Sequence, residues 1–223
     1  MPDPFATFEM KIRPWLDPSL VQQKFVSLAG KSHPDSNREP GAHANFQSVT
    51  AAHQILRDPV RRLEAALELE SPGILDAADG HLVPTNLPDL FMSIATLHRQ
   101  ISAFCGQRAL SHEQPALSQG PHALRPPAGV RGGASRSVST SPLSSALLRS
   151  ETFTLRSDLE HLTQKVNQQW ERCENQVRAV DAVWERRTPE MLRHLASVYR
   201  EMSYLQRWKS QLKEADLLLK TCA

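Results

Sequence analysis

The chain has 223 residues, 40% of them apolar, which suits one or two folded domains and excludes a disordered polymer. Its formal net charge is only +2, with basic and acidic residues interspersed, so neither a nucleic-acid footprint nor a polybasic membrane anchor is present. No apolar run approaches the roughly 20 residues that span a bilayer, and the first eight residues lack the features of a signal peptide. We therefore predict a soluble, cytoplasmic protein that binds neither nucleic acid nor membrane.

The cysteines and histidines predict no metal site and no cofactor. Cys105, Cys173 and Cys222 are far apart and odd in number, which argues against a zinc site and a disulfide framework and favours a reducing compartment. His81, His98 and His161 lack the short spacings that place metal ligands on one face.

The first predicted helix runs from about Pro18 to Gly30. Asp17 is a good N-cap, and proline suits the first helical turn because its missing N–H would be unpaired there anyway. Its apolar stripe consists of Val21, Phe25 and Leu28.

A second helix, from about Ala42 to Leu56, carries a matching stripe. The stripe consists of Phe46, Val49, His53 and Leu56. Two such helices joined by a loop should pack as an antiparallel pair. The loop contains His33, Pro34 and Asp35, which is where a J domain carries its signature.

Two further helices are predicted before the middle of the chain. Asp58 and Pro59 repeat the cap-plus-proline start for a short helix that ends before Ser71. From Leu87, apolar residues recur along one helical face until Gly106, where we predict that this helix ends. No strand alternation is present in the sequence.

The stretch from Gly106 to Ser150 has a different composition. It holds five of the nine glycines together with several prolines and nine serines, so it offers little to bury. It is also mostly basic, which leaves a nucleic-acid-binding or phospho-regulated tail open. We favour a disordered, solvated insertion.

Beyond this insertion, two apolar seams predict a long helical hairpin. The first runs from Leu159 to Trp184, and the second begins after Thr188, which can cap a helix that has proline at its first position. With the helix from Leu87, the hairpin should form a three-helix bundle. The predicted fold is all-α: a J domain at 1–75, a connector and first bundle helix at 76–105, the insertion at 106–150, and the hairpin at 151–223.

This order of parts resembles the HscB family of iron-sulfur co-chaperones. The opening from Pro4 to Pro18, the run from Ala52 to Pro59, and the stretches 90–92 and 198–205 are similar to family segments. Arg62 and Leu67 also fall where the family has arginine and leucine. The resemblance covers about residues 4–104 and 151–217.

The resemblance implies a co-chaperone that is not itself an enzyme. It would stimulate the ATPase of a DnaK/HscA-type chaperone and deliver a client, an iron-sulfur scaffold protein. Its chaperone-binding residues would be His33, Pro34, Asp35, Lys24 and Lys31. Its client-binding residues would be Phe91, Met92, Ala95 and Tyr204.

The sequence departs from the family pattern at both faces. Serines flank His33–Asp35 where the family has an aromatic residue and a lysine, and few basic residues precede the motif. Thr96, Arg99 and Ala103 replace the acidic residues that accompany the client patch. The patch residues could instead be buried in the bundle core, and the exposure of their side chains distinguishes these two interpretations.

Two alternatives to a co-chaperone are catalysis and an adaptor role. A catalytic pair could be drawn from His33 and Asp35, or a thiol dyad from His53 and Cys105, but neither has the local motif that such chemistry needs. The second alternative is a J-like adaptor that uses its coiled-coil hairpin to join another protein complex without an iron-sulfur role.

Overall fold

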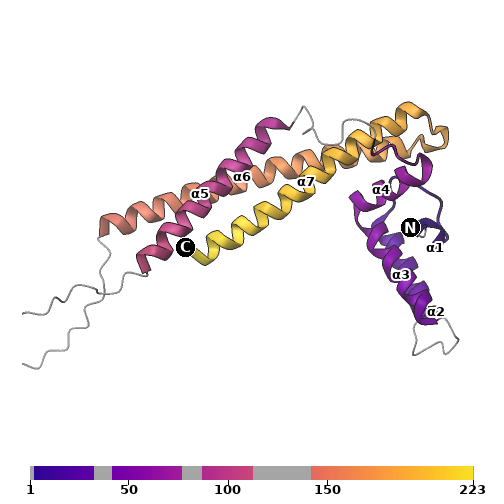
Figure 1. The fold of residues 1–223 in the computed structure, drawn as a ribbon, viewed down its shortest axis with the longest axis horizontal. Coiled ribbons are helices and arrows are strands. Elements are labelled where there is room, and N and C mark those ends of the chain that lie inside the picture. The colour runs from indigo at the N-terminus through magenta and orange to yellow at the C-terminus, as the bar shows by residue number, and fades with distance from the viewer. Residues whose placement is uncertain (1–2, 33–41, 77–86, 113–141, 223) are drawn as a thin grey trace, which may run out of the picture. The chain divides into compact units, whose positions relative to one another are not determined.

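A computed structural model describes residues 3–32, 42–76, 87–112 and 142–222, and all of its regular structure in these ranges is helical (Figure 1). The α-helices are α1 (Pro4–Thr7), α2 (Pro18–Ser32), α3 (Ala42–Arg57), α4 (Pro59–Glu70), α5 (Pro88–His112), α6 (Pro142–Asp181) and α7 (Pro189–Cys222). A short 3-10 helix, η1 (Trp184–Arg186), lies between α6 and α7. The all-α prediction is confirmed.

The chain forms two compact units. The first comprises Met1–Pro88 with Lys165–Trp208, and the second comprises Asp89–Gln164 with Lys209–Ala223. The first unit therefore contains the predicted J-domain helices together with the segments of α6 and α7 around their connection.

Side-chain caps start the helices where the sequence predicts them. The Asp17 carboxylate accepts the Ser19 N–H at 2.9 Å, and the Asp58 carboxylate accepts the Val60 N–H at 2.9 Å. Thr188 Oγ1 accepts the Met191 N–H at 3.3 Å. Each cap satisfies a backbone donor that has no partner within the first helical turn.

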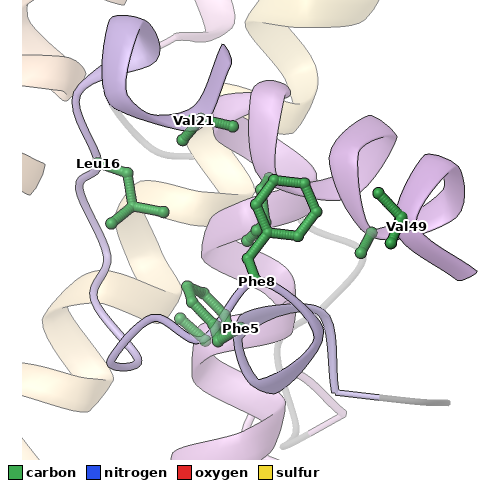
Figure 2. Close-up of a cluster of buried hydrophobic side chains, with 8 residues drawn as sticks. Phe5, Phe8, Leu16, Val21 and Val49 are labelled. Atoms are coloured by element: carbon green, nitrogen blue, oxygen red, sulfur yellow. The ribbon is translucent and has the colours of Figure 1, made fainter. Parts of the chain in front are cut away.

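The core of the predicted J domain lies between α1, α2 and α3 (Figure 2). It consists of Phe5, Phe8, Leu16, Val21, Val49, Ala52, Leu56 and Ala66. Figure 2 shows the Phe5 and Phe8 rings inside this cluster, so the residues before α2 complete the core of the helix pair. Burial of apolar area of this kind is the main stabilising contribution to such a small helical unit.

The second unit is built from α5, the first part of α6 and the end of α7. Its interior is apolar and comes from all three segments, as a three-helix bundle requires. The buried residues include Ile94, Leu97, Ile101, Phe104, Leu155, Leu159, Leu162, Leu212, Ala215 and Leu219.

The helix ends around the predicted insertion differ from those expected. α5 continues past Gly106 to His112, and α6 begins at Pro142, before Ser150. An interior glycine lowers helix stability by only about 1 kcal/mol, which neighbouring turns can offset, so it did not end the helix. Residues 113–141 of the predicted insertion lie outside the described residues.

Candidate functional site

The predicted chaperone-docking motif lies between the two helices of the J-domain pair. α2 ends at Ser32 and α3 begins at Ala42, and His33, Pro34 and Asp35 lie outside the described residues. Ser32 itself is buried, and its hydroxyl donates to the Leu28 carbonyl at 2.8 Å. This is a serine bond to the carbonyl four residues earlier, near the end of α2 and directly before the motif.

The two predicted docking lysines on α2 have different environments. Lys24 Nζ donates to the carbonyl oxygens of Phe8 at 2.9 Å and Glu9 at 3.1 Å. These carbonyls belong to the turn that ends α1, where Glu9 has the positive φ of 50°. Lys24 therefore holds the N-terminal segment on α2, whereas Lys31 is exposed in the last turn of α2.

His53 belongs to the core of the helix pair. Its ring stacks on Phe25, with the ring centroids 3.9 Å apart, and lies parallel to Phe8 at 6.3 Å. Burial lowers the pKa of His53 from its ordinary value, and the nearby Arg57 charge lowers it further. A neutral, stacked imidazole is a packing group, and the alternative of a thiol dyad has no support at this residue.

Arg62 connects the J-domain helices to the N-terminal segment. Its side chain is buried, and it donates from Nη1 to the Leu56 carbonyl at 2.8 Å and from Nε to the Pro14 carbonyl at 3.3 Å. Leu56 lies in the last turn of α3, where the backbone carbonyls have no helical partner. One guanidinium therefore closes α3 and fixes the chain that precedes α2.

Further polar contacts join the N-terminal segment to the α6–α7 connection within the first unit. Asp181 of α6 pairs with Arg13 at 3.1 Å and accepts the Trp15 N–H at 3.4 Å. Trp184 is buried and donates from Nε1 to the Ile12 carbonyl at 2.9 Å. These contacts are not predictable from the sequence, because a periodic pattern does not show which distant segment a polar side chain will contact.

The α6–α7 connection and α7 also contact α4 and its N-cap. Arg187, in the left-handed conformation with φ of 43°, pairs with Glu70 at 3.1 Å. Gln206 of α7 donates to the Asp58 carboxylate at 3.0 Å, so this residue both caps α4 and contacts α7. The J-domain helices thus have polar anchors on the hairpin residues of their own unit.

The predicted client residues of α5 are on its surface. Phe91 is 43% exposed and Met92 is 61% exposed, and Ala95 is exposed one turn later. Burial in the bundle core is therefore wrong for these side chains. Tyr204 belongs to α7 in the first unit and is half-buried, with its ring tilted against Trp208 at a centroid distance of 6.1 Å.

The surroundings of these α5 residues carry both signs of charge: Asp89 lies in the first turn of the helix, and Arg99 lies about two turns after Phe91. Thr96, Arg99 and Ala103 are all exposed on the same helix. Arg99, one turn after Ala95, adds a positive charge that favours a partner surface with negative charge at that position. This charge pattern distinguishes the face from the family pattern noted in the sequence.

Within the described ranges, no group of three or more His, Cys, Asp or Glu side chains is placed to hold a metal ion. His81 lies outside these ranges. None of the described helices is long and apolar enough to cross a membrane.

The first part of the chain is similar to known proteins. Residues 10–64 match the family model of the DnaJ domain. The chaperone protein DnaJ of Methanosarcina thermophila is 38% identical over 47 residues, which is 21% of this chain and 12% of that protein. The curved DNA-binding protein of Shigella dysenteriae is 38% identical over 55 residues, or 25% of this chain and 18% of that protein.

The fold of the whole chain also has a known counterpart. The structure of chaperone HscB from Vibrio cholerae superposes with a TM-score of 0.56, covering 97% of this chain and 99% of that one at 17% identity. The sequence relatives match over a small fraction of their own length, whereas the structural match extends to the helices beyond the DnaJ domain.

Proposed function

We propose that this J-domain protein, which has the HscB fold, is a cytoplasmic co-chaperone that stimulates ATP hydrolysis by a DnaK/HscA-type chaperone. The observation that carries the proposal is the match of residues 10–64 to the DnaJ domain, since this range contains His33–Asp35. The HscB fold, which covers 97% of the chain, supports a role in which the remaining helices serve the same task.

The residues of the motif have the chemistry that docking requires. Pro34 restricts its own φ, so less backbone entropy is lost on binding. The Asp35 carboxylate can accept two parallel hydrogen bonds from an arginine of the chaperone. The exposed ammonium of Lys31, just before the motif, adds attraction to an acidic chaperone surface.

The test is single-turnover ATP hydrolysis by a purified DnaK-type chaperone with and without this protein. Asp35→Asn keeps the side-chain size and removes the charge, so we expect loss of stimulation through a charge-assisted hydrogen bond of about 1.5 to 3 kcal/mol. Asp158→Asn is the matched control, because Asp158 is exposed on α6 and lies outside the DnaJ-domain match. Equal stimulation by wild type and Asp35→Asn would refute docking through the motif.

We propose further that the client is an iron-sulfur scaffold protein and that it binds through Phe91, Met92, Ala95 and Tyr204. The exposure of Phe91 and Met92 supports this proposal, because exposed large apolar side chains on neighbouring positions are typical of binding surfaces. Aromatic side chains of this kind are also frequent binding hot spots.

Scaffold binding is measured by titration calorimetry with purified protein. Phe91→Ala and Tyr204→Ala should each weaken binding by about 1 to 3 kcal/mol, with stimulation of the chaperone alone unchanged. Phe153→Ala is the control for Phe91→Ala, since Phe153 is 75% exposed in the same unit but lies on α6. Wild-type affinity in both folded test variants would exclude these residues as the scaffold contacts.

An adaptor that joins a different protein complex is the second candidate, and the exposed Arg99 favours it. A basic residue in place of the family's acidic ones would select an acidic client. Arg99→Glu separates the two candidates: it should strengthen scaffold binding if the patch takes the family's client and weaken binding of an acidic client.

A further inference from the structure

Two thiols from different helices lie together in the second unit. Cys105 of α5 is 8% exposed, and its Sγ contacts the Leu218 carbonyl of α7 at 3.7 Å. Cys222 lies in the last turn of α7 and is partly exposed, with its Sγ 3.9 Å from the Thr221 hydroxyl. Both cysteines are free thiols.

Helix geometry explains why the thiols meet. Leu218 and Cys222 are four positions apart on α7, so they lie one turn apart on the same face. A side chain that contacts the Leu218 carbonyl is therefore beside the Cys222 side chain. In agreement, burial raises the pKa of Cys105 to about 11, and the hydrogen bond and charge of Cys222 contribute to the rise.

We propose that Cys105 and Cys222 form a reversible disulfide that links α5 to α7, with a small-molecule disulfide such as oxidised glutathione as the oxidant. This site goes beyond the proposed co-chaperone function and does not depend on it. The disulfide would link the C-terminal part of α5 to the last turn of α7 within the second unit.

The reaction proceeds by two thiol–disulfide exchanges. The Cys222 thiolate attacks one sulfur of oxidised glutathione, forms a mixed disulfide and releases one glutathione thiolate. The Cys105 thiolate then attacks the Cys222 sulfur, the bond to glutathione breaks, and a second glutathione thiolate leaves. The protein loses two electrons and two protons, and these reduce one oxidised glutathione to two thiols.

The environment assigns the order of these steps. Cys222 is the more accessible thiol, so it reacts first. In the mixed disulfide Cys222 can no longer carry a thiolate charge that raises the Cys105 pKa, whereas burial, the largest cause, still raises that pKa and Arg108 still lowers it. Cys105 is the resolving thiol because it packs against the turn of α7 that carries Cys222.

The third cysteine provides an internal control. Cys173 is fully buried in the first unit, and burial followed by the Glu201 charge raises its pKa to about 12. A fully buried thiol is not accessible to glutathione, so Cys173 does not start an exchange. Cys173→Ser therefore leaves the proposed disulfide intact.

The experiment equilibrates the full-length protein with defined ratios of reduced to oxidised glutathione at neutral pH, quenches with acid and alkylates free thiols. Peptide mass spectrometry should then identify a Cys105–Cys222 cross-link in wild type and in Cys173→Ser. Cys222→Ser should block it, and Cys105→Ala provides a second variant at the buried position. The oxidised monomer should also melt at a higher temperature, because the cross-link closes a long loop of the unfolded chain.

Three results would overturn the proposal. These are three unreacted thiols in wild type at every glutathione ratio, a stable mixed disulfide at Cys222 that Cys105 never resolves, and cross-linking only between molecules. Cys222→Ser keeps the test decisive, because Cys222 is partly exposed and its replacement removes little packing.

Discussion

Replacing Arg62 tests whether one buried guanidinium holds the J-domain helices together. Arg62→Met retains a long side chain but leaves the Leu56 and Pro14 carbonyls without their donors, which lie at 2.8 and 3.3 Å. Burial lowers the pKa of Arg62, while Glu174, Asp58 and Asp181 raise it, so the charge is buried at a cost that nearby carboxylates only partly offset.

The magnitude follows from these opposing contributions. Two hydrogen bonds from a charged donor together stabilise the fold by about 3 to 6 kcal/mol. Removing the guanidinium also removes the free-energy cost of burying its charge, which offsets part of that loss. We expect Arg62→Met to lower the free energy of unfolding by about 2 to 4 kcal/mol. At a urea dependence of about 2 kcal/mol per molar, the midpoint falls by roughly 1 to 2 M.

Tryptophan fluorescence during urea unfolding is the suitable assay, because all four tryptophans belong to the first unit. The matched control is Arg61→Met, since Arg61 is the exposed neighbour on the same helix and should change stability by less than about 0.5 kcal/mol. If Arg62→Met and Arg61→Met unfold at the same urea concentration, the buried hydrogen bonds do not stabilise the unit.

Three further comparisons probe the same unit. Lys24→Ala should lower the urea midpoint of the first unit, because two hydrogen bonds to backbone carbonyls are lost. Lys31→Ala should weaken stimulation of the chaperone and leave the urea midpoint unchanged. The opposite result for the two variants would mean that the roles of the two lysines are exchanged. The pKa of His53 is lowered in the folded state, so the unfolded chain takes up the proton first and the free energy of unfolding should fall as the pH drops below 6.5. His53→Gln should make the free energy of unfolding depend less on pH in this range. An unchanged pH dependence would contradict the assignment to His53. Asp181→Ala should lower the free energy of unfolding by about 1 to 3 kcal/mol, and Glu185→Ala, which removes a side chain that is 77% exposed, by less than about 0.5 kcal/mol. Equal urea midpoints for the two variants would exclude the Asp181 contacts as a source of stability.

Local patterns predicted the helices because their causes are local. Asp17, Asp58 and Thr188 cap the helices that they were expected to begin, since a cap and a following proline act within one turn. The prediction failed at Gly106, where one glycine did not end α5. A local preference of about 1 kcal/mol is easily outweighed by packing of the whole helix.

The sequence alone determined the helical class, the helix pair around His33–Asp35 and the apolar stripes, because spacing along a helix sets which side chains share a face. Exposure of Phe91 and Met92, the role of Lys24 and the junction made by Arg62 and Asp181 were decided only by tertiary structure. Each of these depends on which distant segment comes to lie beside a side chain. That choice is made by the packing of the whole chain, and no spacing within one helix contains it.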